Sequence, residues 1–504
     1  MIIEFPEFLP DMSALNNPGV TIAKNVIPYG GSYKSFPLFT PYSNALESYC
    51  RGAFSARDPE TATTYNFAGT QTKLYALGVT TTAIFTDVSK LGGYSLGTDE
   101  QWGFTQFGDN CIACHINGAI QKYEMGVDPL FSDLDASAPQ CRYIDVVRSD
   151  FLVAGNTFDA IDGFKPYRVR WAGIGSATAW TVSATTQADY QDLDAGYGWV
   201  QAVLGGNYGV IIQEKAITRM DYIGSPVVFQ FTVIEKNQGT KYPRSAIRIG
   251  DLTFFMGLDG FRVFDGQQSI QIGSSKVDRF FFDDLDTTYD YLICSAVDYK
   301  NSIVMWAYPS LALGQGATNS RILLYNYSPN SKRRWSYVDM NTEFIYTALS
   351  EGYTLDGLDQ WEIDHGLSAN IDILPYPLDS RVWVGNNIEA GIFTSDHKLS
   401  LASSSALTAV IDTAEAQVTT GQKTDIFLVK PVVDGTTASI TMQIGTRNLL
   451  SDAVTWGSVL SLDSDGHCQT RSNARYHRLR VTVASNFTHA LGVEVLEYKA
   501  AGIR

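Results

Sequence analysis

One segment of the sequence matches a known cofactor-attachment pattern: Cys111-Ile112-Ala113-Cys114-His115. In such a C-x-x-C-H segment both thiols bond a haem porphyrin and the histidine ligates its iron. Here the segment follows a Gly-Asp turn and is typical of a strand, in which alternation places Cys111 and Cys114 on opposite faces of the sheet. We therefore predict two buried strand cysteines and no haem or other cofactor.

Two aspartate-rich segments could bind a cation. Four aspartates lie between residues 283 and 290, but they lack the glycine and the final glutamate of a 12-residue EF-hand loop. Asp463-Ser464-Asp465-Gly466 begins like such a loop, yet its twelfth position is Ala474. We predict a solvated acidic loop, a hairpin turn and no metal site.

The remaining polar residues form no recognisable catalytic pattern. The six histidines lack H-x-x-x-H and H-E-x-x-H spacing, and neither a Walker A sequence nor a nucleophile elbow occurs. Sialidase-like propellers carry Ser-x-Asp-x-Gly-x-Thr-Trp boxes, from which the nearest segment, Ser461–Asp465, departs. We predict that the protein is not an enzyme.

Basic residues gather near the end of an acidic chain. The net charge is −16, from 37 Lys and Arg against 53 Asp and Glu, which disfavours a duplex-binding surface because phosphate contacts need clustered cations. Residues 471–504 instead carry six Lys and Arg against two Glu. Arg475, Arg478 and Arg480 form either a solvated face or a patch that docks on an acidic neighbour, with Val481 on the opposite face of the strand.

The elements that position these residues are predicted to be strands. Tyr, Phe and Gly are frequent, and apolar runs with a period of two are broken by Gly, Asn and Asp. No run of about eighteen apolar residues occurs, so we predict no membrane span. The start, MIIEFPEFLPDM, lacks the pattern of a signal peptide, so we expect synthesis in a cytoplasm, with reduced thiols.

A pair of apolar strands around a polar turn recurs six times. The turns lie near residues 70, 109, 150, 207, 251 and 301, close to the roughly 40–50 residue period of four-stranded propeller blades. We predict an all-β fold: a β-propeller of about six blades with a C-terminal β-sandwich. The alternative is a run of unrelated hairpins in two sandwiches. The Asp-rich segment Lys276–Tyr291 lacks alternation and is expected to form a short helix or an excursion between blades.

Three regions are predicted along the chain. An N-terminal arm over residues 1–64 leads into the first blade, the propeller covers 65–390, and the sandwich covers 391–504. Pro375 and Pro377 mark the change of texture. Residues 345–397 either close the propeller or link the two domains.

Short segments in a fixed order resemble the tail nozzle, or tail hub, proteins of short-tailed bacteriophages. They are an irregular arm from Phe8 to Pro28 that ends in Gly31–Pro37, a first blade at Tyr65–Tyr75, a middle blade at Gly260–Gly266 with Val277–Phe281, and a closing strand at Tyr476–Val481. The order of these segments, which span most of the chain, carries the resemblance.

The resemblance implies a structural subunit of a virion tail without catalytic residues. Such subunits form a homo-oligomeric ring, expected here to be a hexamer, below the head-to-tail adaptor protein and beside tail fibre or spike proteins. DNA transits the ring without specific binding, so we expect an acidic lumen, with Asp283, Asp284 and Asp286 as candidates. The alternative is a carbohydrate-binding or carbohydrate-active propeller used in host attachment, which needs a concave pocket with paired carboxylates and aromatic platforms.

Overall fold

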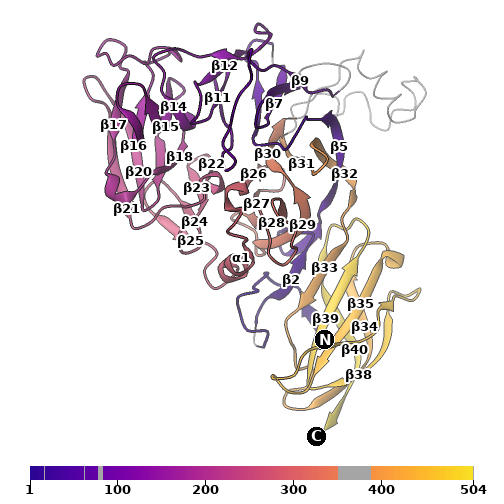
Figure 1. Ribbon diagram of the computed structural model, residues 1–504. Coiled ribbons are helices and arrows are strands. Elements are labelled where there is room, and N and C mark those ends of the chain that lie inside the picture. The colour runs from indigo at the N-terminus through magenta and orange to yellow at the C-terminus, as the bar shows by residue number, and fades with distance from the viewer. Residues whose placement is uncertain (16, 62, 78–82, 350–387, 503–504) are drawn as a thin grey trace, which may run out of the picture.

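A computed structural model describes residues 1–15, 17–61, 63–77, 83–349 and 388–502, and strands dominate them (Figure 1). Four-stranded antiparallel units follow one another around an axis. The first two are β6–β9 (Ala53–Arg57, Thr64–Gly69, Leu74–Leu77, Thr86–Asp87) and β10–β13 (Gly103–Phe107, Asn110–Cys114, Gln121–Glu124, Ser132–Asp133). The next two are β14–β17 (Gln140–Val147, Phe151–Asp159, Gly163–Trp171, Asp189–Asp192) and β18–β21 (Val200–Leu204, Gly209–Gln213, Ala216–Gly224, Val228–Lys236).

Three further units complete a β-propeller. They are β22–β25 (Ile247–Ile249, Leu252–Met256, Phe261–Phe264, Ser269–Gln271) and β26–β29 (Cys294–Asp298, Ile303–Tyr308, Asn319–Asn326, Trp335–Thr342). The last combines β30–β32 (Phe344–Leu349, Ile388–Phe393, Lys398–Ala406) with β5 (Pro37–Ala45). The described residues therefore form seven blades, one more than the approximate number expected.

The seventh blade explains why the turn spacing suggests six. Its strands come from three separate stretches of the chain, so no single hairpin repeat reveals it. Five of the six predicted turns join the first two strands of blades two to six, whereas the turn near residue 70 joins β7 to β8. Part of the segment 345–397, namely β30 and β31, lies in the closing blade, while 350–387, with Pro375 and Pro377, lies outside the described residues.

The N-terminal strand β5 closes the propeller by pairing antiparallel with β32. Beside this pair, the buried carboxylate of Glu343 accepts a hydrogen bond from the backbone N–H of Cys50 at 2.9 Å and contacts Nδ1 of His397. Cys50 leads into blade one, whereas Glu343 and His397 belong to the blade-seven region. The carboxylate therefore joins the first and last blades.

Two groups of strands come from both ends of the chain, one a separate sheet and the other continuous with blade six. One holds β1 (Ile2–Glu4), β3 (Val26–Tyr29), β4 (Ser32–Ser35), β34 (Lys423–Val433), β38 (Cys468–Ala474) and β40 (Ala490–Gly502). The other holds β2 (Val20–Lys24), β33 (Ala409–Thr413), β35 (Ile440–Arg447), β36 (Thr455–Trp456), β37 (Leu460–Ser461) and β39 (Tyr476–Val483). Most of their buried apolar residues, among them Val26, Val429 and Val481, belong to one core cluster, whereas Ile27 belongs to another.

These strand pairings cross the boundaries of the three predicted regions, and they do not by themselves divide the chain into domains. The expected boundary at 390 and 391 falls inside β31, and β6 of the first blade lies within the expected arm. Strands from residues 2–35 take part in the sheets beside β33–β40, so a sandwich made from 391–504 alone stays a prediction.

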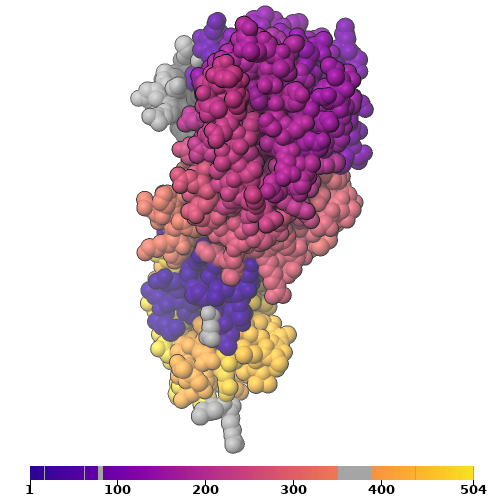
Figure 2. All heavy atoms as spheres, turned by 90° about the vertical axis from the view of Figure 1, so that its left-hand side faces the viewer, coloured from indigo at the N-terminus to yellow at the C-terminus, as the bar shows by residue number. Residues whose placement is uncertain are grey.

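Strand β2 joins the propeller to these sheets. It pairs parallel with β29 of blade six and antiparallel with β33, which makes one ten-stranded sheet from β26 to β36 and β37. Asn25, at a positive φ of 56°, donates its backbone N–H to Tyr337 O at 2.7 Å. Figure 2 shows the indigo N-terminal residues between the propeller and the yellow C-terminal strands.

Glu343→Ala tests the closure of the propeller. The substitution leaves the buried N–H of Cys50 without its acceptor, so we expect the free energy of unfolding to fall by about 1–3 kcal/mol in urea titrations. Glu47→Ala is the control, because Glu47 is exposed and pairs only with Lys73 in the described salt bridges, and it should cost no more than about 1 kcal/mol. Equal losses in both variants would contradict the role of Glu343.

Candidate functional site

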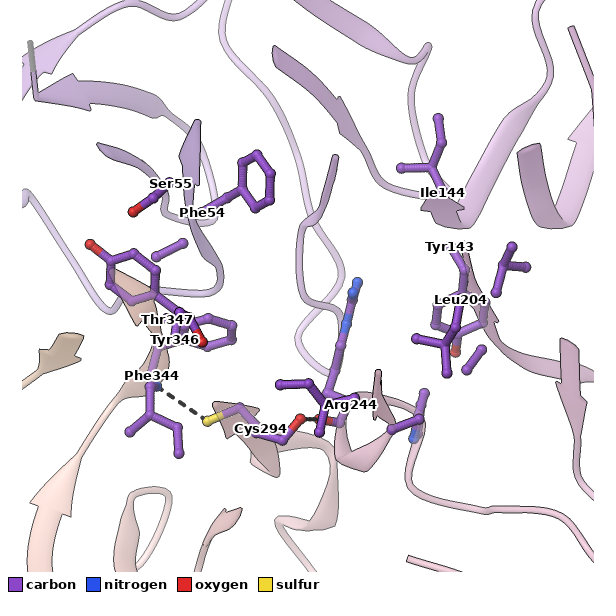
Figure 3. Close-up of a pocket in the computed structure, with 18 of the residues that line it drawn as sticks. Phe54, Ser55, Tyr143, Ile144, Leu204, Arg244, Cys294, Phe344, Tyr346 and Thr347 are labelled. Carbon is purple, nitrogen blue, oxygen red and sulfur yellow. Dashed lines mark hydrogen bonds between the residues drawn. The ribbon is translucent and has the colours of Figure 1, made fainter. Parts of the chain in front are cut away.

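An axial cavity of about 470 Å³ lies between the innermost strands of the blades (Figure 3). Its walls come from β6, β14, β18, β22, β26 and β30, and from the 3₁₀ turn η2 (Pro243–Ser245). Arg244 stands in the cavity, and its Nη2 donates to the backbone carbonyls of Gln101 at 3.2 Å and Arg142 at 3.5 Å. The guanidinium carbon lies 5.6 Å from the ring centroid of Tyr143.

From the single turn η2, Arg244 therefore contacts several blades around the axis. Its own carbonyl accepts a hydrogen bond from Ser295 Oγ at 2.8 Å, which adds blade six to the contacts with the strands of blades two and three. A cavity of this volume is the size of a small-molecule site. The propeller axis thus has no room for a nucleic-acid duplex.

Asp145 joins three blades close to the axis. Its carboxylate accepts hydrogen bonds from Thr105 Oγ1 at 3.0 Å, from its neighbour Val146 N at 2.8 Å and from Gly205 N at 2.6 Å. These donors belong to blades two, three and four. Burial raises the pKa of this carboxyl, and the hydrogen bonds and Arg248 oppose that rise. The arrangement is that of a structural carboxylate.

The aspartates expected to line a channel lie in and after the short helix α1 (Asp278–Asp284). Of the two forms expected for this segment, a short helix or an excursion, the structure has the short helix, and the expected solvated acidic loop is wrong for Asp284. Asp283 is exposed and pairs with Arg279 at 3.2 Å, and Asp286 is half-buried and accepts from Thr288 N at 3.0 Å. Asp284, by contrast, is buried. A role for Asp283 and Asp286 in a channel stays a prediction.

Asp284 is part of a buried network of charges and hydroxyls. Its carboxylate accepts from Tyr308 Oη at 3.0 Å, Ser310 Oγ at 2.8 Å and Arg321 Nη1 at 2.8 Å. Arg321 also pairs with Asp339 at 2.7 Å, and Asp339 pairs with Lys24 of β2 at 2.7 Å. The carboxylate does not face solvent, so Asp284 cannot contribute its charge to a channel wall.

The basic C-terminal residues are engaged within the chain. Arg480 forms a bidentate ion pair with the buried Asp412, with a distance of 2.8 Å to each carboxylate oxygen. Its guanidinium carbon lies 4.0 Å from the ring centroid of Trp456. Arg478 donates to Thr21 Oγ1 of β2. Leu479 and Val481 are buried on the other face, as alternation predicts.

These intrachain contacts occupy arginines that were predicted to form a docking patch. Arg478 and Arg480 hold β2, β33 and β39 together, and Arg475 N donates to Asn448 Oδ1 at 3.3 Å. A partner role for Arg475, Arg478 and Arg480 stays a prediction. Any partner would meet side chains that already bind their own chain.

The predicted strand character of the C-x-x-C-H segment is confirmed by β11. Cys111 and Cys114 are both buried but belong to different core clusters, on opposite faces of the blade. His115 is buried with its ring centroid 4.8 Å from that of Trp102. Burial, and secondarily Lys90, lowers the pKa of His115 to about 4. Cys111 is thus a core residue between blades one and two, Cys114 is one between blades two and three, and His115 packs on Trp102.

The second candidate cation segment forms a turn, but the expected hairpin is wrong, because β37 before it pairs with β35 and β38 after it pairs with β34 in the other sheet. Asp463 Oδ1 accepts from Asp465 N at 3.0 Å and from His467 N at 2.8 Å, and Asp463 N donates to His467 O at 2.8 Å. Within the described ranges, no cluster of three or more His, Cys, Asp or Glu side chains could hold a metal ion. Across the same residues, no helix has the length and apolar character needed to cross a membrane.

The segments Gly260–Gly266 and Val277–Phe281 pack against each other. Asp278 at the start of α1 accepts from Phe261 N at 3.0 Å. A Cβ on Gly260 or Gly273 would lie 2.1 or 2.0 Å from an Asp278 oxygen. Phe261 then packs against Phe281 at 5.0 Å between ring centroids. The close contact between these residues therefore has a structural role. The sequence indicates the segments but not this contact.

Comparisons with known proteins bear on the fold alone. No protein-family model matches the sequence, and no curated protein matches it. The structure is similar to the WD40 domain of Toxoplasma gondii coronin, with a TM-score of 0.35, 9% identity, and coverage of 64% of this chain and 81% of that one. It is also similar to a quinonprotein alcohol dehydrogenase-like protein from Bacteroides thetaiotaomicron, with a TM-score of 0.32, 8% identity, and coverage of 63% and 75%. The chain is a β-propeller protein by its own strand pairing.

Gly260→Ala tests the contact between blade five and α1. Gly260 has a φ of +141°, and a methyl group there would displace the carboxylate of Asp278. We expect a loss of more than about 3 kcal/mol in unfolding free energy, or failure to fold. Gly250→Ala is the control, since Gly250 has a φ of +60° and no atom within 4 Å of the added Cβ, and should cost about 1–2 kcal/mol. Similar losses would contradict the steric argument.

His115→Gln tests the buried imidazole through pH. An unfolded histidine binds a proton near pH 6.5, whereas folded His115 stays neutral down to about pH 4. Unfolding is therefore increasingly favoured as pH falls from 6.5 to 4, and this part of the loss should reach about 2–3 kcal/mol. We expect the variant to lose that much less stability than the wild type between pH 7 and pH 4.5 in urea titrations. His467→Gln, at a surface turn, controls for histidine loss, and parallel pH profiles for wild type and His115→Gln would refute the assignment.

Proposed function

We propose that the protein is a structural subunit of a bacteriophage tail nozzle or hub, arranged as a homo-oligomeric ring that continues the DNA ejection channel below the head-to-tail adaptor. The observation that carries the proposal is the ten-stranded sheet, which runs from blade six through β2 into the C-terminal sheets. A ring wall under the pressure of ejected DNA is more stable when the propeller and the C-terminal sheets do not move relative to each other.

The shared core supports the same reading. One cluster of buried residues contains Trp306 and Trp335 of blade six, Phe8 of the N-terminal segment and Val481 of β39. The ring centroid of Phe8 lies 5.5 Å from those of Phe280 and Tyr337. Such continuous packing favours one rigid body over a pair of mobile domains.

The DNA path in this proposal runs between copies of the chain. Arg244 occupies the axis of each propeller, and the 470 Å³ cavity around it is far smaller than a duplex requires. The lumen is therefore a surface outside the propeller axis, and its expected lining is acidic or neutral because cations would retain phosphates. Exposed Asp283 remains a candidate for that surface.

The alternative of a carbohydrate-active propeller needs two available carboxylates beside an aromatic platform. Exposed Phe164 and Trp199 lie 5.5 Å apart between ring centroids and could offer such a platform. The nearby acids Asp162 and Asp192 are both bound by Arg168, whose own side chain is 4% exposed. Their engagement favours the structural proposal.

Electron cryomicroscopy of the parent particle tests the proposal. We expect six copies in a closed ring coaxial with the tail, with Asp283 nearer to the lumen than Arg475, Arg478 and Arg480. One copy per particle, a linear filament, or arginines projecting into the lumen with the aspartate outside would overturn the proposal.

A further inference from the structure

The part of the chain that the structure describes places one positive charge in the axial cavity. Among the described lining residues Arg244 is the sole charged one, and none is Asp or Glu. The hydrogen bonds of its side chain within the described residues run through Nη2 to two backbone carbonyls. Within those ranges Nη1 is then free to donate, and so is Nε on the opposite edge of the guanidinium.

The walls around this guanidinium are mainly apolar. Phe54, Ile144, Leu204 and Ile345 come from four different blades and line the cavity, and Figure 3 shows the first three around it. Two polar groups beside this centre are already occupied: Tyr346 Oη donates to Asn66 Oδ1 at 3.2 Å, and Thr347 Oγ1 donates to Val297 O at 3.1 Å. Arg244 is thus the cationic group of this cavity, and it has donors to spare.

The cavity extends from this apolar centre to the propeller surface. Tyr299, in the turn between β26 and β27, lines it and is 43% exposed. Its volume of about 470 Å³ lies within the range of about 300–1,000 Å³ for small-molecule sites. A bound molecule would bury its apolar part among the blades and present one anionic group to Arg244.

From these contacts we infer that the propeller axis is a binding site for a small organic carboxylate with an apolar, aromatic or branched body. The carboxylate accepts from Nη1 of Arg244, and the apolar body contacts Phe54, Ile144 and Leu204. A neutral analogue of the same shape lacks the charge-assisted hydrogen bonds and binds more weakly. The inference does not depend on the proposed tail ring.

Titration calorimetry of the full chain with 3-phenylpropionate and its neutral amide tests the site. On the wild type we expect saturable binding of one carboxylate per chain, at least tenfold tighter than the amide. Arg244→Met should weaken carboxylate binding at least tenfold and leave amide binding unchanged, and Arg244→Lys should restore part of the affinity. Arg279→Met, which removes an exposed arginine of the α1 surface, should bind both probes as the wild type does.

Two outcomes would overturn the inference: no saturable binding of the carboxylate to the wild type, or equal affinity of the wild type for the carboxylate and the amide. Unchanged carboxylate binding by folded Arg244→Met would do the same. Should Arg244→Met fail to fold, the wild-type comparison of the two probes still decides, because it needs no variant.

Discussion

The position of β2 between β29 and β33 is the constraint on which the rest of the structure depends. Lys24 of this strand pairs with Tyr337 in the outer strand of blade six, and Val20, Ile22, Ala23 and Lys24 pair with a strand nearly 400 residues later in the chain. Lys24 is fixed by Asp339 at 2.7 Å, and Thr21 accepts from Arg478. Without β2, both β29 of the propeller and β33 of the C-terminal strands would lose a neighbouring strand.

The network behind β2 extends this constraint into the propeller. Asp339 binds both Lys24 and Arg321, and Arg321 binds Asp284 at the end of α1. Removing one partner of a buried ion pair leaves an uncompensated charge, which is strongly destabilising even where the intact pair adds little net stability. The sequence of the acidic segment 283–290 suggests a solvated loop, but its residue Asp284 is linked to β2 through Arg321 and Asp339.

Local patterns in the sequence predicted the repeated parts of the fold. Alternation placed Cys111 and Cys114 on opposite faces, and the loss of alternation marked α1. Both are properties of adjacent residues, which a sequence displays directly. The seventh blade was missed because β5 and β32 are separated by more than 350 residues, and pairing at that distance leaves no local signal.

The candidate site was predictable only in part for the same reason. Asp284 lies in an acidic run, but its partner Arg321 comes from another blade, so its burial could not be anticipated from composition. Arg480 belongs to a recognisable basic strand, yet Asp412 of the neighbouring strand determines its environment. Arg244 had no sequence signal at all, because the axis exists only when the blades close.

Differential scanning calorimetry of the full chain tests most directly whether β2 makes the molecule one rigid unit. A continuous sheet and a shared core predict a single cooperative transition in which the calorimetric and van't Hoff enthalpies agree. Two separate transitions, with the C-terminal sheets unfolding while the propeller remains folded, would contradict the account.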